Sequence, residues 1–434
     1  MPDPITNFNE APDFRVETLG ECKFASPFHN GFFVPDDSRV LYQSRLEEVR
    51  PYFTAGKEPP SLECGGPRQK IFFDPAKTRA GIVTCGGLCP GLNDVIRAIV
   101  LGLHYHYGVG GTLGFRYGYE GLVERLGHQL LNLTPDSVAP IYQVGGSILG
   151  SSRGPQDPAE MLDYLQKLGV NILFAVGGDG TLRGAGKISD EARRRGYELA
   201  VVGVPKTIDN DISFISQSFG FITAVSESRT AIASAHAEAN GARNGIGLVK
   251  LMGRDSGFIA AFACLATSEV NYCLIPEVKF SLPRLLQSLQ QRLAEKGHAV
   301  IVAAEGAGQD LLASAGERDA SGNVKHGDIG TYLASEIKKH FKAANTEVNL
   351  KYIDPSYIIR SVPANARDSG FCLYLGHNAV HAAMAGRTNI VVGTWNEQPT
   401  HLPISVATSS RKKIEPCGKL WGAVLAATGQ PAEL

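Results

Sequence analysis

The segment from Asn171 to Thr181 constrains the fold of this chain more than any other stretch. Its first part, Asn171 to Val176, is an apolar run that predicts a buried strand of an α/β sheet. Gly177-Gly178-Asp179-Gly180-Thr181 follows, and apolar residues then recur at helical spacing. A glycine turn between a strand and a helix start can hold a phosphate chain on backbone amides. Asp179 would lie at the end of the strand, where a hard cation bridging phosphates needs an oxygen ligand.

The alternative for this motif is a sharp turn without a ligand, so the rest of the chain has to decide. A chain of 434 residues exceeds the usual size of one core, and two domains are therefore expected. The net charge of -1 provides no overall positive field to attract nucleic acid, so any binding of anions must be local.

Neither a membrane segment nor a metal-binding cysteine set is expected. No apolar run reaches the length of about 18 residues that a transmembrane helix needs, and the N-terminus has no features of a signal peptide. The eight cysteines are scattered. Cys85 and Cys89 are close in sequence, but no second pair or nearby histidine completes a zinc set. We interpret them as reduced, mostly buried thiols of a cytoplasmic protein.

A second glycine loop appears where the alternation of strands and helices begins. Residues 1–76 show no strong sheet pattern and are interpreted as an N-terminal extension across the main body, with a possible helix around Leu41–Val49. Gly81–Cys85 then predicts a strand, Gly86–Gly91 a glycine loop, and the residues through about Tyr107 a helix with one apolar face. In an open parallel sheet such turns lie at one edge, so the two glycine loops would converge there.

Two further loops carry charged residues. The small-residue loop Gly145–Arg153 ends in an arginine, which suits bidentate contact with phosphate oxygens, although a solvated surface arginine is the alternative. Leu199–Val204 predicts another buried strand that runs into Pro205-Lys206-Thr207-Ile208-Asp209-Asn210-Asp211. Carboxylates and a lysine directly after a buried strand lie where α/β enzymes place their chemistry. An acidic turn that caps a helix is the alternative.

The remaining chain repeats the alternation and predicts a second lobe. For this lobe strands are expected at Ile246–Leu251, Tyr272–Ile275 and Ala299–Ala303, and helices at Ile222–His236 and Leu282–Glu295; a helix at about 368–385 and a last strand at Asn389–Gly393 come next. The first of these strands leads into Met252-Gly253-Arg254, and the third leads into Glu305. The order predicts two doubly wound, Rossmann-like α/β lobes with an active-site cleft between them.

Five motifs in this order resemble the 6-phosphofructokinase family. They are Gly86-Gly87 with Pro90-Gly91-Leu92-Asn93, Gly150-Ser151-Ser152-Arg153, Gly177–Thr181, Pro205–Asp211 and Met252-Gly253-Arg254. The resemblance covers about Ala80 to about Gly393, and five concordant motifs make it highly specific. Pro51-Tyr52-Phe53 and Asp354–Arg360 resemble the plant and trypanosomatid branch, which is also found in bacteria.

The resemblance implies transfer of the γ-phosphoryl group of Mg-ATP to the 1-hydroxyl of D-fructose 6-phosphate, a step of glycolysis. In this interpretation Asp209 resembles the general base, Thr207 hydrogen-bonds nearby, Asp211 orients the loop and Asp179 resembles the Mg²⁺ ligand. The other implied contacts are Gly87, Arg153, Gly154, Gly178, Gly180 and Thr181 for the nucleotide, and Ile208, Met252, Gly253, Arg254, Glu305, Tyr357 and Arg360 for the sugar phosphate, with Arg254 also catalytic. Phosphoryl transfer needs mainly positioning and charge neutralisation, which this set supplies.

The resemblance also implies an organisation for the chain. The expected domains are the extension 1–76, a nucleotide-binding lobe of 77–220 with about 359–410, and a sugar-phosphate lobe of 221–358 with about 411–434. Family members are commonly dimers or tetramers, so a homodimer or homotetramer is expected. Many members carry an arginine that reaches a neighbouring subunit's sugar phosphate; Gly245 stands there in this sequence, with Arg243 two residues earlier. Lys351 stands where many bacterial relatives have arginine, which keeps the charge but loses the planar fork.

The phosphoryl donor depends on Gly180 and Lys206. Pyrophosphate-using relatives usually have aspartate at position 180, where its charge would meet the α-phosphate of a nucleotide, and like charges about 4 Å apart in a partly buried site repel by several kcal/mol. Gly180 leaves that space open and favours ATP, whereas Lys206 occurs with either donor. A pyrophosphate-dependent enzyme is the alternative.

Two more distant alternatives come from other classes. NAD kinases and lipid kinases also use a GGDG loop, but they lack the combination of Pro205–Asp211 with Met252-Gly253-Arg254. A non-catalytic protein that binds sugar phosphate would typically lose the base or the metal carboxylate, whereas Asp209 and Asp179 are both present.

Overall fold

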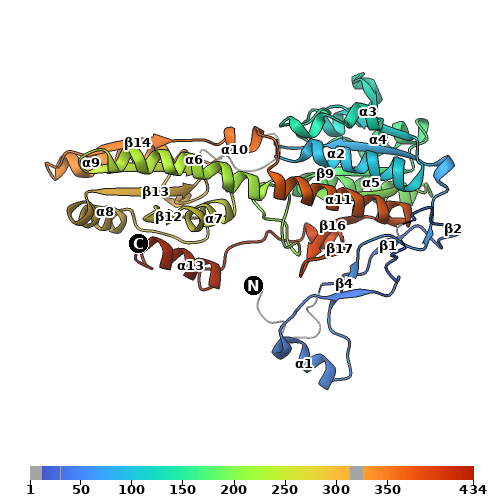
Figure 1. The fold of residues 1–434 in the computed structure, drawn as a ribbon, viewed down its shortest axis with the longest axis horizontal. Coiled ribbons are helices and arrows are strands. Elements are labelled where there is room, and N and C mark those ends of the chain that lie inside the picture. The colour runs from blue at the N-terminus through green and yellow to red at the C-terminus, as the bar shows by residue number, and fades with distance from the viewer. Residues whose placement is uncertain (1–11, 30, 313–325) are drawn as a thin grey trace.

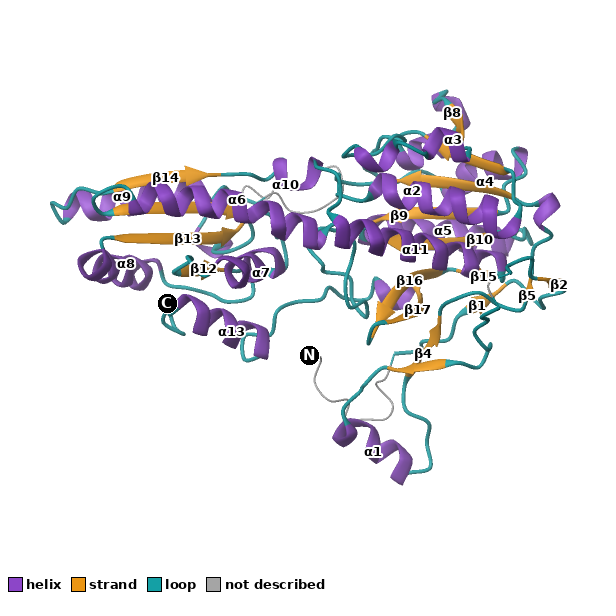
Figure 2. Ribbon diagram, viewed as in Figure 1, coloured by secondary structure: helices purple, strands orange, loops and turns teal. Residues whose placement is uncertain are grey.

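Two α/β lobes lie side by side in the computed structural model, which describes residues 12–29, 31–312 and 326–434 (Figure 1). Each lobe is built on its own sheet, one of nine strands and one of four, with helices against both faces (Figure 2). This arrangement confirms the predicted doubly wound α/β architecture. No helix in the described part of the chain is long and apolar enough to cross a membrane.

The nine-stranded sheet has a parallel centre and antiparallel edges. Its spatial order is β3 (Arg39–Leu41), β4 (Ser61–Cys64), β17 (Gln398–Pro403), β16 (Ile390–Trp395), β10 (Ala200–Pro205), β9 (Ile172–Gly177), β6 (Arg79–Thr84), β7 (Gly111–Phe115) and β8 (Leu130–Asn132). The five strands from β16 to β7 are parallel, and β17, β4, β3 and β8 each pair antiparallel. Strands β9 and β10 are buried along their whole length, because helices cover both faces.

Helices cover the two faces of this sheet with different apolar clusters. One face packs against α2 (Leu92–Leu101) and α11 (Ala366–Met384). The other packs against α4 (Pro158–Lys167), α5 (Asp179–Arg194) and the short α12 (Ile404–Ala407). Since successive strand residues point to opposite faces, Phe174 belongs to the first cluster and Leu173 to the second. The four-residue α3 (Pro135–Val138) lies beside α2.

The four-stranded sheet is parallel throughout, in the order β12 (Tyr272–Leu274), β13 (His298–Ala304), β11 (Gly245–Leu251) and β14 (Asn349–Ile353). Its helices are α6 (Phe221–Asn240), α7 (Phe258–Thr267), α8 (Leu282–Lys296), α9 (Ile329–Ala343) and α13 (Lys419–Thr428). Helices α8 and α9 cover one face, while α6 and α7 cover the other. Strands β13 and β14 point toward the nine-stranded lobe (Figure 2), so the residues after them face that lobe.

The described part of residues 1 to about 75 contains short strands, so the prediction of an extension without sheet is wrong there. Strands β3 and β4 extend the large sheet beyond β17, while β1 (Glu17–Thr18) pairs with β15 (Arg387–Thr388) and β2 (Phe24–Ala25) with β5 (Lys70–Ile71). Strands of two to four residues are too short to show an alternating pattern, and two of these pairings join strands more than 300 residues apart.

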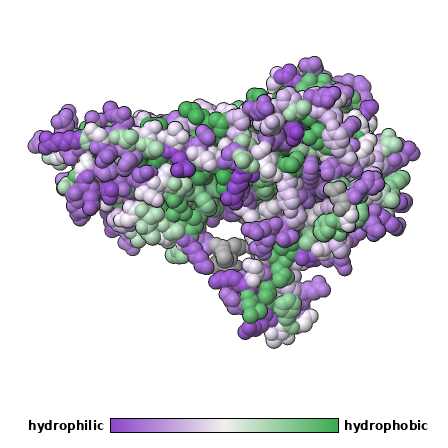
Figure 3. Space-filling view, in the orientation of Figure 1, coloured by the Kyte–Doolittle hydropathy of each residue, from purple (hydrophilic) through white to green (hydrophobic). Residues whose placement is uncertain are grey.

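The predicted helix around Leu41–Val49 is shifted. Leu41 ends β3, and α1 runs instead from Leu46 to Thr54, with Val49 and Tyr52 as its buried residues. Figure 1 shows α1 on an arm that projects from the nine-stranded lobe. Apolar side chains gather on this arm (Figure 3), where Leu46 and Phe53 are 61% and 62% exposed.

A buried cluster of charged residues ties the extension to the large sheet. The Glu63 carboxylate of β4 accepts from Arg68 at 3.3 Å, from Arg387 at 3.0 Å and from the His401 ring of β17 at 2.9 Å. Burial alone would raise the pKa of Glu63, but His401 and Arg387 together lower it to about 2. The carboxylate is therefore ionised at every physiological pH and balances two buried guanidinium groups.

We predict that Glu63→Gln lowers the free energy of unfolding by about 3 kcal/mol, because removing one partner leaves Arg68 and Arg387 buried without their counter-charge. Urea unfolding at pH 7 measures the effect. The control is Glu21→Gln at an exposed position of the same extension, which should change the stability by less than about 0.5 kcal/mol. Equal values for the two variants would contradict a role for the cluster.

Neutral histidines pack where α11 meets the segment after α2. The Tyr107 hydroxyl and the Nδ1 atom of His381 are 2.7 Å apart, and Phe28 of the extension stacks on His106. Burial, with smaller effects from neighbouring histidines, lowers the pKa of His381 to about 3 and that of His377 to about 4. At pH 5 both rings are therefore neutral in the folded protein, whereas in the unfolded chain they would be protonated.

We predict that the folded state loses stability as the pH falls below 6.5, since the unfolded chain takes up protons that the folded one does not. At pH 5 the contribution of His381 amounts to about 2 kcal/mol relative to pH 8. Replacing it in His381→Gln destabilises the protein at pH 8 through lost packing. The free energy of unfolding of the variant should differ from that of the wild type by about 2 kcal/mol less at pH 5 than at pH 8. Urea unfolding at both pH values measures this, and a constant difference would contradict it.

Candidate active site

The Gly177–Thr181 turn lies where the sequence predicts it, between β9 and α5. A Cβ atom added to Gly177 would lie 2.2 Å from the Thr181 hydroxyl, so only glycine fits where the strand meets the helix. Gly178 caps α5, and Asp179, Gly180 and Thr181 form its first turn. A Cβ atom added to Gly180 would meet nothing within 4 Å, and the position is exposed. The space beside Gly180 at this helix start is therefore open, and a helix start is where backbone amides can bind an anion.

Three cationic side chains converge on the backbone of the second glycine loop. Lys206 is buried, and its Nζ atom donates to the Gly87 carbonyl at 2.6 Å. A Cβ atom added to Gly87 would lie 3.2 Å from the Arg360 guanidinium and 3.7 Å from that of Arg153. Burial lowers the pKa of Lys206, and the two arginines lower it further. Two cations flanking bare backbone form an electropositive environment that suits phosphate oxygens.

The loop after β10 holds its acidic residues through hydrogen bonds. The Thr207 hydroxyl donates to Asp211 Oδ1 at 3.1 Å and accepts the backbone N–H of Asp209 at the same distance. Asn210 adopts a left-handed conformation with a φ of 53°, and its side chain accepts the N–H of Ser218 at 3.0 Å. The conformation of this loop is therefore fixed from both sides of Asp209.

Asp209 has the most perturbed environment of the predicted site residues. Its Oδ1 atom is inaccessible to solvent, and no hydrogen-bond donor for it lies among the described residues. Burial raises the pKa of the Asp209 carboxyl well above its usual value; Asp211, Glu305 and Asp255 raise it further, and Arg411 opposes them. An unpaired buried carboxylate oxygen of raised basicity is a strong acceptor for a substrate proton.

The second lobe contributes its residues from the ends of β11 and β13. Gly253 has a φ of 130°, and its carbonyl accepts the N–H of Gly306 at 3.1 Å, so the two loops are paired. Burial raises the pKa of Glu305, and Arg254 is the cation that opposes this most. Met252 is partly buried against the apolar cluster. Arg254 and Glu305 therefore come together from strands that are neighbours in the sheet.

Arg360 and Tyr357 lie at the short helix α10 (Ile358–Ser361) and its start. The guanidinium carbon of Arg360 lies 4.8 Å from the centroid of the Tyr357 ring, which is itself 73% exposed. Arg360 also lies beside Gly87. The sequence predicts Arg360 as a sugar-phosphate contact and Gly87 as a nucleotide contact, so residues of the two predicted sets are neighbours here. Gly154 and Arg153 lie on the neighbouring loop, where Arg153 is exposed.

Asp179 is the carboxylate that the sequence predicts as the cation ligand. It is partly buried, and its Oδ2 atom forms an ion pair with the exposed Arg183 at 2.9 Å. Burial raises its pKa; Arg183 and Arg411 oppose the shift, and Asp211 adds to it. No group of three or more potential ligand side chains lies within the described ranges. One carboxylate nevertheless fits a magnesium ion that is held mostly by substrate phosphates.

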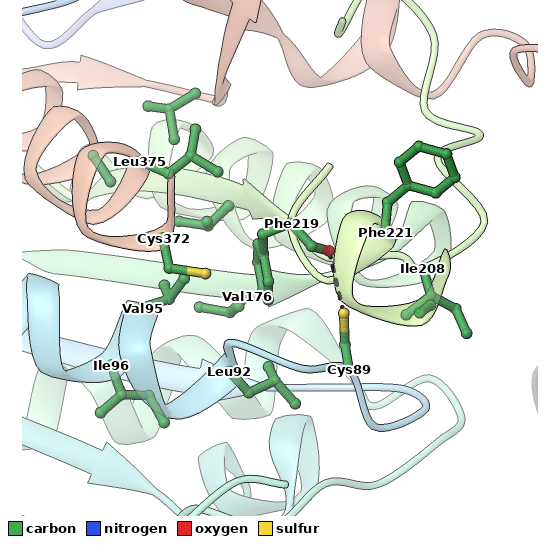
Figure 4. Packing of buried hydrophobic residues seen from close by; sticks show 14 of the residues in the cluster. Cys89, Leu92, Val95, Ile96, Val176, Ile208, Phe219, Phe221, Cys372 and Leu375 are labelled. Carbon is green, nitrogen blue, oxygen red and sulfur yellow. Dashed lines mark hydrogen bonds between the residues drawn. The ribbon is translucent and has the colours of Figure 1, made fainter. Parts of the chain in front are cut away.

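Ile208 lies differently from the other residues of its loop. Its side chain is 6% exposed and belongs to the apolar cluster shown in Figure 4, together with Phe219 and Phe221. Figure 4 also shows the thiol of Cys89 donating to the Phe219 carbonyl, at 3.2 Å. The second glycine loop and the loop after Asp209 are thus anchored in one core.

Arg411 and Asp255 were missed by the sequence interpretation. Arg411 forms ion pairs with Asp255, directly after Arg254, and with Asp211. The one available signal was the run Arg411-Lys412-Lys413, which resembles a solvated surface segment. Gly245, where the resemblance implies an arginine in many family members, begins β11, and an added Cβ would lie 2.0 Å from the Ala239 carbonyl. No side chain fits there, whereas Arg243 and Lys351 are exposed nearby.

Comparisons with known proteins identify the family. The family model described as Phosphofructokinase matches residues 79–383. An ATP-dependent 6-phosphofructokinase of Borreliella burgdorferi is 47% identical over 98% of this chain and 98% of its own length. That of Trypanosoma brucei brucei is 49% identical over 94% of this chain and 86% of its own. The crystal structure of a pyrophosphate-dependent phosphofructokinase from Marinobacter aquaeolei superposes on this chain with a TM-score of 0.66 at 21% sequence identity. The match covers 78% of this chain and 86% of the other, and it shows that the two share a fold. This chain belongs to the phosphofructokinase family.

Proposed function

We propose that this protein is an ATP-dependent 6-phosphofructokinase, which transfers the γ-phosphoryl group of ATP to the 1-hydroxyl of D-fructose 6-phosphate. The products are fructose 1,6-bisphosphate and ADP. The observation that carries the proposal is the buried, unpaired Oδ1 atom of Asp209, whose charged neighbours include Glu305 and Asp255 of the second lobe. Relatives named for this activity align over nearly the whole chain.

Asp209 acts as the general base in this reaction. Its unpaired oxygen accepts the proton of the sugar 1-hydroxyl as that oxygen attacks the γ-phosphorus. A raised pKa makes the carboxylate a better base near neutral pH. Thr207, which binds the Asp209 N–H and Asp211, holds the carboxylate in place. Arg254 offsets the negative charge that builds up on the transferred group, because a guanidinium matches phosphoryl oxygens.

The nucleotide and the sugar bind to different lobes in this proposal. Glycines 87, 154, 178 and 180 with Thr181 and Arg153 bind the nucleotide, and Asp179 would hold Mg²⁺, which neutralises charge on the phosphates when bound. The sugar phosphate is bound by Arg254, Glu305, Tyr357 and Arg360, with the backbone of Met252 and Gly253. The proposed lobes are a nucleotide lobe of 77–220 with about 359–410 and a sugar lobe of 221–358 with about 411–434, so that Arg360 reaches the sugar phosphate from the nucleotide lobe.

Oligomerisation and location are further parts of the proposal. The projecting arm exposes Leu46 and Phe53, and a second copy of the chain would cover these apolar side chains, consistent with a homodimer or homotetramer. All eight cysteines are free thiols, which suits the reducing environment of the cytoplasm.

We predict that Asp209→Asn lowers the turnover number by about 1,000-fold, since the amide keeps the shape of the carboxylate but cannot take the proton. The affinity for ATP should stay within about threefold of the wild type. Steady-state assays and nucleotide titration measure the two quantities. The control is Asp190→Asn on the exposed face of α5, which should retain full activity. A near-wild-type turnover of Asp209→Asn would exclude Asp209 as the base.

The donor is tested at Gly180, where a side chain meets no protein atom. We predict that Gly180→Asp keeps the melting temperature, because a carboxylate suits the first turn of α5. It should lower kcat/KM for ATP by about 100-fold or more, through repulsion of the nucleotide phosphates. Gly180→Ala, the control for bulk without charge, should lose less than about fivefold. An unchanged rate of the aspartate variant with ATP would contradict the assignment.

Assays of the wild type with each donor complete this test. Phosphorylation of fructose 6-phosphate with ATP is the expected result. Turnover with pyrophosphate and none with ATP would replace the proposal by the pyrophosphate-dependent alternative. The buried Lys206 is compatible with either donor.

A further inference from the structure

The segment from Ser410 to Ile414 connects the two lobes beside the proposed site. It lies between α12, which packs on the nine-stranded lobe, and α13, which packs on α7 of the other lobe (Figure 1). We call residues 410–414 the crossing segment. Its sequence carries three consecutive cationic residues, none of which the proposed reaction uses.

Backbone hydrogen bonds attach the crossing segment to both lobes. On the first lobe, Lys412 N–H donates to the Asp211 carbonyl at 2.8 Å and the Ser213 hydroxyl donates to the Ser410 carbonyl at 2.9 Å. On the second lobe, the Ser256 hydroxyl donates to the Lys412 carbonyl at 2.6 Å. The segment therefore binds the loop after Asp209 and the loop after Arg254 at the same time.

Arg411 joins the same two loops through its side chain. Its guanidinium forms ion pairs with the Asp255 carboxylate and, at 3.6 Å, with Asp211 Oδ2. About a third of the Arg411 side chain is exposed, and Asp211 is 14% exposed. A guanidinium presents donors in a planar fork, so it can bind two carboxylates at once.

One ion pair and two hydrogen bonds lead from Arg411 to the proposed base. Arg411 contacts one oxygen of Asp211, and the other oxygen accepts the Thr207 hydroxyl. That hydroxyl oxygen in turn accepts the backbone N–H of Asp209. A displaced Asp211 would free Thr207 to rotate, and the Asp209 carboxylate would lose its fixed position. Arg411 itself makes no hydrogen bond or ion pair with Asp209 among the described contacts.

The positive charge of Arg411 supports the Asp209 base, as its contacts do. The charged groups that face Asp209 are Asp211, Glu305 and Asp255, which disfavour its ionised form, and Arg411, which favours it. Arg411 therefore both orders the loop and supports the carboxylate that the reaction needs.

We infer that Arg411 is a positioning residue that ties Asp211 of the first lobe to Asp255 of the second, and so fixes the Asp209 base at the phosphoryl-transfer site only when the lobes are correctly spaced. The inference rests on the proposed function. The alternative is an ordinary surface ion pair that contributes little to stability and nothing to the reaction.

The experiment compares Arg411→Gln with Lys413→Gln, an exposed neighbour that loses the same charge. We expect Arg411→Gln to lower kcat about 30- to 100-fold while KM for ATP and for fructose 6-phosphate changes less than about threefold. The acid limb of its pH–rate profile should move to higher pH, because a cation that favours ionised Asp209 is gone. Lys413→Gln should match the wild type in all of these.

Two further single variants and one double variant separate positioning from folding. Arg411→Lys keeps the charge without the fork, so its acid limb should stay in place while kcat falls several-fold. Asp255→Asn, and the double variant with Arg411→Gln, should lose no more activity than Arg411→Gln alone, because the two residues act through one contact. If Arg411→Gln does not fold, the single variants Arg411→Lys and Asp255→Asn test the inference in its place.

The possible outcomes are distinct. Equal kinetics of Arg411→Gln and Lys413→Gln would overturn the inference. So would a lower melting temperature with unchanged kcat per active site, or additive losses in the double variant. A wild-type enzyme that does not phosphorylate fructose 6-phosphate would instead overturn the proposed function.

Discussion

Acidic side chains from both lobes share a small volume at the facing ends of the two sheets. Burial raises the pKa of Asp209, Asp211 and Glu305. Like charges about 4 Å apart repel by about 4 kcal/mol at an effective dielectric constant of 20, so such a cluster needs cations among its members. Arg254 opposes the shift of Glu305, and Arg411 opposes those of Asp209 and Asp211. The rest of the structure depends on bringing these opposite charges together from distant parts of the chain.

Within the residues that the structure describes, the chain passes between the lobes three times, and each passage carries a residue of the candidate site. The first follows β10 and carries Asp209, the second follows β14 and carries Arg360, and the third follows α12 and carries Arg411. One apolar cluster continues from the nine-stranded sheet to α6 and the four-stranded sheet. Because the passages start from a shared core, a change in the spacing of the lobes would move all three residues relative to one another.

Local sequence determines the loops of the site, because their conformation depends on neighbouring residues. Gly177 is required by Thr181 four residues later, and Thr207 orders the loop between itself and Asp211. Strands β9 and β10 were predictable because helices bury both of their faces, which leaves a continuous apolar run. The short strands β3 and β4 were not, since β4 pairs with β17, more than 300 positions away, and β3 joins the sheet only through β4.

The sequence by itself determined the α/β class and the set of family motifs, and it predicted which residues would serve as phosphate loops, base and metal carboxylate. Only the tertiary structure decided how these groups are placed and balanced. The contact of Arg411 with Asp255 joins residues 156 positions apart, and the Glu63 pair with His401 joins residues 338 apart. Arg360 likewise reaches Gly87 only in the folded chain. Spacing along a sequence predicts contacts within one turn or one βα unit, whereas counter-charges for buried groups come from whichever segment the packing of the core brings near.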